Sequence, residues 1–223
     1  MRFEVDIIAH VFDCDGVLLD SNEAKIKALS FALKAVGCPE NFICWATQEF
    51  RKNFGRSRKK HFDVFQNFKG IPNYHFSAYN AELAVKIYTD QVVDLYVGCE
   101  VISESLDYLE KIYKHQSIYV VSASDEIELK KILPSRIPAI SPDNIYGGPT
   151  SKIANINRLK KSIPCNQMMF YGDAIQDAMA AIATGIPFMG LSKYSADPCA
   201  FEEFCVSKNL NVEKHLNKVP INV

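Results

Sequence analysis

A long gap separates the first strand-like segment of this sequence from the second. Residues 7–12 read IIAHVF, an apolar run rich in β-branched side chains that predicts a buried strand. The next such run, SIYVV, begins only at residue 117. Across the intervening residues, apolar side chains recur at helical spacing and no strand is indicated. The sequence therefore predicts a core whose first strand is followed by a long helical insertion.

From residue 117 onwards, strand-like and helical segments alternate. Strands are predicted at residues 117–121, 144–146, 167–171 and 187–191, with helices at residues 125–133, 151–161 and 174–184 between them. This alternation is typical of βα units that form a parallel sheet. We therefore predict an α/β fold. Its core comprises residues 1–19 and 97–223, and an all-helical domain, residues 20–96, is inserted after the first strand.

Particular residues predict where helices begin and end. Ser21 is a suitable N-cap for the first helix of the insertion. Pro134 is expected to end the helix that begins at residue 125, because proline interrupts the hydrogen bonds of a helix. Gly185 is expected to close the helix before it. Residues 208–223 are polar and weakly periodic, and they predict no element.

The composition argues against several classes of binding partner. Of 223 residues, 25 are Lys or Arg and 26 are Asp or Glu, so the formal net charge is −1. A charge near zero disfavours a general binder of nucleic acids or of membrane surfaces. We therefore expect no nucleic-acid or membrane partner, and either a monomer or a homodimer.

The cysteines and the N-terminus bear on the cellular compartment. There are seven cysteines and no CxxC pair, which favours free thiols in a reducing compartment over disulfides or a zinc site. The apolar stretch in MRFEVDIIAHVF is too short and too charged for a secretory signal. No run approaches the roughly 18 apolar residues of a membrane-spanning helix. We therefore expect a soluble, cytoplasmic protein.

Four polar elements follow predicted strands or begin predicted helices. They are Asp13-Cys14-Asp15-Gly16, Ser122-Ala123-Ser124, Lys152, and Gly172-Asp173 with Asp177 four residues later. In a parallel sheet, the carboxyl ends of all strands lie at one edge, where open α/β folds bind their ligands. These side chains are therefore expected to converge, although they are far apart in the sequence.

Such a set of side chains suits phosphoryl transfer. A carboxylate can act as the nucleophile, and Mg²⁺ prefers carboxylate oxygens and water as ligands. The ion lets an anionic carboxylate approach an anionic phosphate, while a hydroxyl and an ammonium group hold the other phosphate oxygens. A second acid can protonate the leaving oxygen and then activate water. The pattern therefore predicts an enzyme that uses Mg²⁺ and forms an aspartyl-phosphate.

At these positions the sequence resembles the haloacid dehalogenase-like hydrolase superfamily, in its phosphatase and β-phosphoglucomutase branch. The family's first motif, DxDGVL after a hydrophobic strand, matches residues 13–18. The second motif matches Ser122, the third matches Lys152, and the fourth, GDxxxD, matches residues 172–177. The motifs occur in the family's order over nearly the whole chain. The resemblance implies a Rossmann-like parallel sheet with a small helical cap inserted after the first strand.

The resemblance also implies roles for the acidic residues. Asp13 would be the nucleophile and a ligand of Mg²⁺. Asp15 would be the general acid and base, with its backbone carbonyl on the metal. An Asp at this position favours phosphate esters, because the dehalogenases and phosphonatases of the superfamily lack it. Asp173 would be a further metal ligand, and Asp177 would support the metal site without binding the metal.

Two residues are expected to hold the phosphate. By the same resemblance these are Ser122 and Lys152. Ser124 is an alternative to Ser122, although it could instead cap the following helix, and Lys152 could instead be a solvated helix residue. Gly16 is expected to take a positive φ at the bend beside the metal.

The helical insertion resembles the cap of this superfamily, which closes over the site and excludes water. It carries a basic run of six residues: Arg51, Lys52, Arg56, Arg58, Lys59 and Lys60. Arg56 and Arg58 lie in a stretch that resembles the cap's substrate-specificity loop, and they could contact a second anionic group on the substrate. A solvated face is the alternative explanation of the basic run.

The sequence thus predicts a Mg²⁺-dependent phosphatase that acts on a small phosphorylated metabolite, such as a sugar phosphate or a phosphorylated acid. A phosphomutase of the β-phosphoglucomutase type shares the motifs and the cap, and it is the first alternative. A non-catalytic regulatory relative is the second alternative, against which the four filled catalytic positions argue.

Overall fold

Six parallel strands form one sheet in the computed structural model, which describes residues 7–219. The sheet order is β3-β2-β1-β4-β5-β6, so the first strand lies centrally, and every neighbouring pair is parallel. The strands are β1 (Ala9–Phe12), β2 (Ser117–Asp125), β3 (Ile145–Gly148), β4 (Met168–Gly172), β5 (Phe188–Leu191) and β6 (Asn211–Glu213). This arrangement confirms the prediction of a Rossmann-like α/β fold.

Helices cover both faces of the sheet, which explains why its central strands are buried along their whole length. The core helices are α5 (Ser103–Ile112), α6 (Glu126–Arg136), α7 (Lys152–Leu159), α8 (Ile175–Thr184) and α9 (Pro198–Ser207). Alternate residues of a strand point to opposite faces. In β1, Ala9 and Val11 pack in the cluster that includes α7, α8 and α9, whereas Phe12 packs in the cluster that includes α5 and α6.

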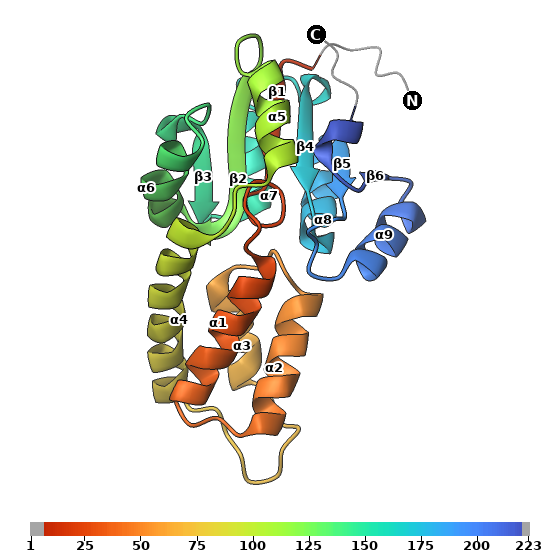
Figure 1. The fold of residues 1–223 in the computed structure, drawn as a ribbon. Helices are drawn as coiled ribbons and strands as arrows, with labels where there is room; N and C mark the ends of the chain where they lie inside the picture. Colours follow the sequence, from red (N-terminus) through yellow and green to blue (C-terminus); the bar gives the residue numbers. More distant parts are fainter. Residues whose placement is uncertain (1–6, 220–223) are drawn as a thin grey trace.

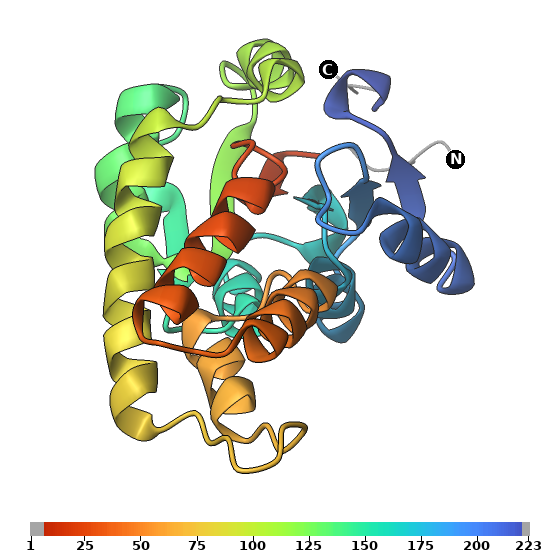
Figure 2. The same ribbon diagram turned by 60° about the horizontal axis from the view of Figure 1, so that its bottom comes forward.

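Four helices lie between β1 and α5, as the gap between the first two strands predicts. They are α1 (Asn22–Ala35), α2 (Glu40–Lys52), α3 (Arg58–Gln66) and α4 (Ala78–Gly98), and we call residues 22–98 the helical segment. The strand arrows in Figure 1 point toward this segment, which lies below the sheet there, and Figure 2 turns its four helices to the front. The helical segment therefore lies at the carboxyl ends of the strands.

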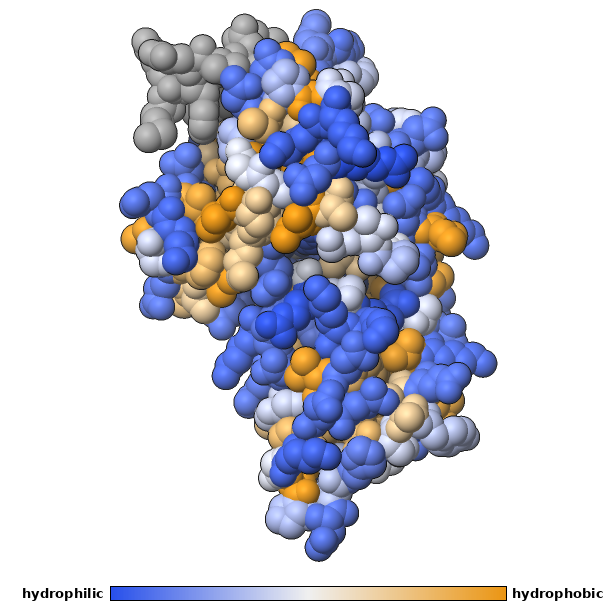
Figure 3. All heavy atoms as spheres, turned by 180° about the vertical axis from the view of Figure 1, so that it is seen from behind, coloured by the Kyte–Doolittle hydropathy of each residue, from blue (hydrophilic) through white to orange (hydrophobic). Residues whose placement is uncertain are grey.

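The helical segment has its own aromatic core. The ring of Phe42 lies 5.0–5.1 Å from the rings of Tyr74 and Phe76. The rings of Phe65, Phe68 and Trp45 also contact Phe42. The outside of the molecule, seen from behind in Figure 3, is mostly hydrophilic with scattered apolar side chains. Within residues 7–219 no helix combines the length and the apolar character that crossing a membrane requires.

The structure differs from the sequence prediction at several element ends. Pro134 lies inside α6, which continues to Arg136, so the predicted stop was wrong. The proline falls in the last turn, where its missing N–H removes at most one helical hydrogen bond. Strand β2 extends beyond residue 121, with a register shift against β3 between Val121 and Asp125. Gly185 does close α8, with φ +68°.

The end of the chain also contains elements that its sequence did not predict. Helix α9 begins with Asp197 as N-cap and Pro198 in its first turn, a combination that is typical of helix starts. The short strand β6 pairs with β5 at the edge of the sheet. Three residues of mixed polarity at an edge carry too little periodicity to indicate a strand.

Candidate active site

The carboxyl ends of β1, β2 and β4 bring the predicted residues to one place. Asp13 directly follows β1, Asp173 directly follows β4, and Ser122 lies in the last part of β2. The backbone N–H of Asp13 donates to the carbonyl of Tyr171 at 2.9 Å, so the ends of β1 and β4 stay paired up to the site. Lys152 begins α7 and lines the same pocket as Asp13 and Ser122.

Gly16 lets the loop after β1 turn back beside Asp173. Its φ is +72°, as the sequence analysis expected. A Cβ atom at this position would lie 2.2 Å from Asp173 Oδ2 and 2.5 Å from Asn22 Nδ2. Both the backbone conformation and the close approach therefore require glycine here.

Asp13 forms a buried ion pair with Lys152. The ammonium Nζ of Lys152 lies 2.8 Å from Asp13 Oδ2, and it also donates to Asp177 Oδ1. Burial alone would lower the pKa of Lys152, but the carboxylates of Asp13 and Asp177 raise it above its usual value. The ammonium group therefore stays charged between the two carboxylates.

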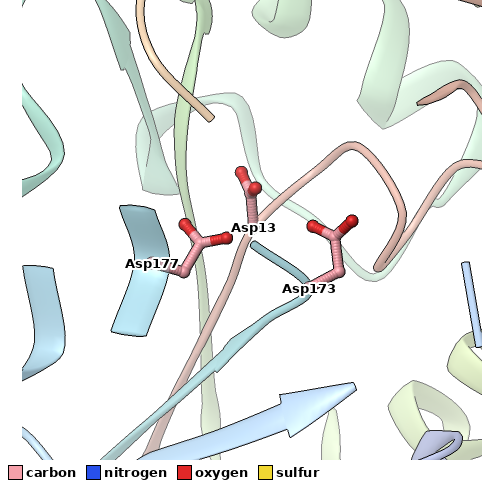
Figure 4. Close-up of side chains that lie close together, drawn as sticks. All are labelled: Asp13, Asp173 and Asp177. Atoms are coloured by element: carbon pink, nitrogen blue, oxygen red, sulfur yellow. The ribbon is translucent and has the colours of Figure 1, made fainter. Parts of the chain in front are cut away.

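Three buried carboxylates, those of Asp13, Asp173 and Asp177, form a compact group. Each offers an oxygen within 4.8 Å of the others, and in Figure 4 Asp13 stands between the other two. The Asp177 oxygens are both engaged, one by Lys152 and the other by the backbone N–H of Ala174 at 3.2 Å. By contrast, Oδ1 of Asp13 and Oδ1 of Asp173 are buried without a hydrogen-bond partner among the described residues.

These two oxygens fit a hard cation such as Mg²⁺. A buried acceptor without a partner is costly, and Mg²⁺ is usually bound by one or two carboxylates together with water. The second oxygen of Asp173 accepts a hydrogen bond from Asn22 Nδ2 at 2.7 Å, which fixes the orientation of the carboxylate. The donor set thus suits a metal held by Asp13 and Asp173, with Asp177 paired to Lys152 instead.

The pKa values of Asp13 and Asp173 also favour a bound cation. Burial and the nearby carboxylates of Asp177 and Asp15 raise the pKa of Asp13 to about 7, against the opposing effect of Lys152. Burial and the carboxylates of Asp177 and Asp13 raise the pKa of Asp173 well above its usual value. A cation between Asp13 and Asp173 would offset these unfavourable interactions and restore the charged forms.

Asp15 is held by a different set of donors, from Ser21, from the helical segment and from β2. Its oxygens lie 2.5 Å from Ser21 Oγ, 2.6 Å from Lys25 Nζ, 2.9 Å from Ser124 Oγ and 3.0–3.1 Å from the Tyr96 hydroxyl. Burial would raise the pKa of Asp15, but Lys25 and these hydrogen bonds outweigh it and hold the pKa below its usual value. Asp15 is therefore held as a carboxylate.

The two serines after residue 121 have distinct surroundings. Ser122 is buried, and its Oγ accepts a hydrogen bond from the backbone N–H of Ser124 at 3.2 Å. Ser124 donates to Asp15 and does not cap α6, whose N-cap is Asp125. Ser21 is the N-cap residue of α1, as expected, but its side chain donates to Asp15 and makes no capping hydrogen bond. Both serines line or border the site.

A pocket of about 610 Å³ connects these groups to the helical segment. Asp13, Asp15, Ser122 and Lys152 line it on the side of the core. Residues of α3, α4 and the loop between α2 and α3 line it on the other side. The pocket therefore joins the carboxylate group to side chains that belong to the helical segment.

Arg56 and Arg58 both line this pocket, but each already faces a carboxylate. Arg58 binds the two carboxylate oxygens of Glu128 on α6 at 3.1 and 3.3 Å, and it donates to Thr89 at 2.7 Å. Arg56 lies 3.9 Å from Glu49. Neither guanidinium is thus an isolated positive charge.

Four polar site residues escaped the sequence analysis. Asn22 and Lys25 are buried polar residues on α1, a helix that otherwise buries apolar side chains, and this contrast was a usable signal. Ser21 was matched to the continuation of the first motif and expected as a helix cap, but no role in the site was predicted for it. Tyr96 gave no signal, because an aromatic residue on a helix is ordinarily a core residue.

Comparison with known proteins finds one matching family model and several solved structures with the same fold. A family model described as haloacid dehalogenase-like hydrolase matches residues 9–185. A search of curated protein sequences finds no match.

Several solved structures share the fold at low sequence identity. A predicted phosphatase from Clostridium acetobutylicum is 20% identical, with a TM-score of 0.75 and 96% of each chain covered. A predicted phosphoglycolate phosphatase from Haemophilus somnus is 16% identical, with a TM-score of 0.77 over 96% of this chain and 97% of that chain. A protein from Bacteroides vulgatus named as a β-phosphoglucomutase is 17% identical, with a TM-score of 0.71 over 93% and 83%.

Proposed function

Because the chain belongs to the haloacid dehalogenase-like hydrolase family, we propose that it is a Mg²⁺-dependent phosphatase of a small phosphorylated metabolite. The observation that carries this proposal is the position of Asp13 at one end of the pocket. One of its oxygens is paired with Lys152, and the other is buried without a partner, as is Oδ1 of Asp173, whose carboxylate offers an oxygen within 4.8 Å of one of Asp13. A nucleophile, a phosphate-binding cation and two metal-binding oxygens are thus in reach of one phosphate group.

The proposed metal ligands are Asp13, Asp173 and the backbone carbonyl of Asp15. When bound, Mg²⁺ supplies positive charge that lets the Asp13 carboxylate approach a phosphate and stabilises the transferring group. Asp177 keeps Lys152 in place, and Asn22 keeps Asp173 in place. These contacts hold both metal-binding carboxylates in orientation before any substrate arrives.

In the first proposed step, Lys152 and Ser122 hold the non-bridging phosphate oxygens. An oxygen of Asp13 attacks phosphorus, the bond from phosphorus to the ester oxygen breaks, and Asp15 delivers a proton to the departing alkoxide. The phosphoryl group is then an acyl phosphate on Asp13. Because Asp15 is held as a carboxylate by Lys25, its role as an acid requires that this contact loosen when substrate binds.

In the second proposed step, Asp15 acts as a base. It removes a proton from a water molecule, which attacks phosphorus and releases inorganic phosphate from Asp13. The carboxylate form that the four donors stabilise is the form that this step needs. Asp15 thus ends the cycle protonated and ready for the next ester.

We propose that the helices of the helical segment form a cap domain of residues 20–96, with the core comprising residues 1–19 and 97–223. Its helices α1 and α4 supply Lys25 and Tyr96 to Asp15, and α3 lines the far side of the pocket. A cap that contacts the acid–base residue can couple substrate enclosure to the chemistry and can exclude water during phosphoryl capture.

The test is phosphate release from a broad panel of phosphate monoesters, with Mg²⁺ or with a chelator. Asp13→Asn is expected to lower kcat/KM by about 10⁴-fold or more, because the nucleophile is lost. Asp15→Asn is expected to accumulate the phosphorylated protein, detectable by mass spectrometry, because its hydrolysis slows. Asp20→Asn is the matched control, since Asp20 is exposed and outside the pocket.

Three outcomes would overturn parts of the proposal. Wild-type activity of Asp13→Asn would exclude this nucleophile. Full activity in the presence of chelator would exclude the metal. Turnover that requires a bisphosphate activator and releases no free phosphate would replace the phosphatase with a phosphomutase.

A further inference from the structure

Part of the pocket wall on the helical segment is apolar. Six apolar or aromatic side chains form it: Phe50, Phe54, Phe62, Ala81, Val85 and Tyr88. Ser57, Gln66 and several charged residues line the same side of the pocket. The rings form a continuous surface, with Phe50 5.3 Å from Phe54 and 6.1 Å from Tyr88, and Tyr88 6.4 Å from Phe62. Such a wall offers few hydrogen bonds to the several hydroxyl groups of a sugar.

The cations around this wall are already paired with carboxylates. Arg58 binds Glu128 and lies over the face of Tyr88, at 5.4 Å from the ring centre. Lys59 pairs with Asp63 at 2.8 Å, and Arg56 faces Glu49. Glu82 also lines the pocket and has no cationic partner within residues 7–219. A second anionic group on the substrate would therefore meet paired cations and a free carboxylate.

His61 adds polarity to this end of the pocket without adding charge. Its ring is buried, lines the pocket and lies 4.3 Å from the ring of Phe50. No other residue in the described part of the chain hydrogen-bonds to the imidazole. Burial, together with Arg56 and Lys25, lowers the pKa of His61 to about 3, so the ring is neutral near pH 7. The neutral ring can donate one hydrogen bond from one nitrogen and accept one at the other, so it suits an uncharged group.

The size of the pocket also bears on the substrate. Pockets that enclose whole organic ligands measure roughly 300–1,000 Å³. At about 610 Å³, this pocket lies well inside that range. A phosphorylated acid with only two or three carbon atoms would leave most of the apolar wall uncovered.

If the chain is the phosphatase proposed above, we infer that its substrate is a phosphate monoester with an uncharged, mainly apolar body. The phosphate lies between Asp13 and Lys152, and the body extends between α3 and α4 along the six wall residues. The body carries no second phosphate or carboxylate. At most a few hydroxyl or carbonyl groups are present, and one of them lies beside His61.

The first test uses primary alkyl phosphates, whose leaving groups have similar acidity. From ethyl to pentyl phosphate, kcat/KM with Mg²⁺ is expected to rise about fourfold per added methylene, until the wall is covered. Glucose 6-phosphate and 2-phosphoglycolate are expected to fall at least tenfold below pentyl phosphate. Binding of ethyl- and pentylphosphonate, measured by calorimetry, gives the same comparison without catalysis.

A variant of the wall links this preference to its residues. Val85→Thr, which has nearly the same shape and replaces a methyl group with a hydroxyl, is expected to lower kcat/KM for pentyl phosphate about threefold to tenfold and to lower kcat/KM for ethyl phosphate less. Val97→Thr is the control, because Val97 is on the same helix but is exposed and outside this pocket. Ala81→Leu, which narrows the pocket, is a second variant with the same expected direction.

The outcomes separate this inference from the function on which it rests. Inactivity toward every ester, with Mg²⁺ and folded protein, would overturn the phosphatase itself. Hydrolysis of ethyl phosphate with no higher kcat/KM for pentyl phosphate, or a clear preference for 2-phosphoglycolate, would overturn only the inference that the substrate body is apolar. An equal loss of kcat/KM for pentyl phosphate in Val85→Thr and Val97→Thr would show that the wall residues do not determine the preference.

Discussion

Lys25 and Asp15 form the ion pair that decides the charge state of the proposed acid–base residue. Both side chains are buried, and their charged atoms lie 2.6 Å apart. An opposite charge at such a distance lowers the pKa of a carboxyl group by about 1–3 units. The pair therefore favours the basic form of Asp15, which the proposed mechanism needs in order to activate water.

We predict that Lys25→Gln moves the acidic limb of the pH profile of kcat to higher pH, because the Lys25 ammonium group lowers the pKa of Asp15. Without the ammonium group, Asp15 holds its proton to higher pH and the base is lost earlier as the pH falls. The measurement is steady-state phosphate release between pH 4 and 9 with saturating Mg²⁺. Lys27→Gln is the control, an exposed lysine on the same helix. Coincident profiles for the two variants would refute this role of Lys25.

At the level of elements, the contact between α3 and α6 controls whether Arg58 can reach the substrate. Its guanidinium is bound in two places by Glu128 and in a third by Thr89. A bidentate pair of this kind satisfies most of the donors of an arginine. Helix α6 therefore keeps the arginine away from a role that its position in the pocket would otherwise permit.

We predict that Glu128→Gln makes the protein accept anionic substrates. The variant leaves Arg58 without its carboxylate, so the ratio of kcat/KM for 2-phosphoglycolate to that for pentyl phosphate is expected to rise about tenfold. Glu203→Gln on α9, exposed and remote, is expected to leave the ratio unchanged. An unchanged ratio in Glu128→Gln would mean that Arg58 does not contact the substrate, whether or not Glu128 holds it.

The elements also show which parts of the site a sequence can predict. Asp13 and Asp173 follow buried strands, and parallel strands bring their carboxyl ends together whatever the packing of the helices. Lys25 and Tyr96 reach Asp15 only because α1 and α4, at the carboxyl edge of the sheet, are each rotated about their own axes so that these side chains face it. That rotation depends on tertiary packing, which local periodicity does not encode. The end of β2 was missed for a related reason, since its register shift depends on β3.

At the scale of the whole molecule, the buried carboxylates link stability to pH and to metal. The folded-state pKa of Asp13 is about 7, above the usual value of 3.8. The stability that this difference contributes is fully present below pH 3.8 and is lost as the pH rises through 7. Metal-free protein is therefore destabilised at alkaline pH by its own site, and bound Mg²⁺ should reverse this effect.

We predict that saturating Mg²⁺ raises Tm more at pH 8 than at pH 6. At pH 8 the metal binds carboxylates that are already ionised, whereas at pH 6 it must displace the proton of Asp13. Ligand at 100 times its Kd contributes about 2.7 kcal/mol, which corresponds to a shift of roughly 5–10 °C for a chain of this size. Asp173→Asn should abolish the shift and Asp20→Asn should keep it. Equal shifts of Tm by Mg²⁺ at pH 6 and pH 8 would contradict a pKa of about 7 for Asp13.

The chain leaves the sheet for the helical segment and returns to it at adjacent positions. Leu19 pairs with Val101 in an antiparallel bridge, Asp20 donates to the carbonyl of Glu100 at 2.9 Å, and Ile102 donates to the carbonyl of Leu18 at 2.9 Å. A segment whose two ends meet in this way can be exchanged for another without stretching the sheet, because closing the loop costs little more when its length changes. Under the proposed function, a replacement segment would have to keep the donors that Lys25 and Tyr96 supply to Asp15 while it changes the wall of the pocket.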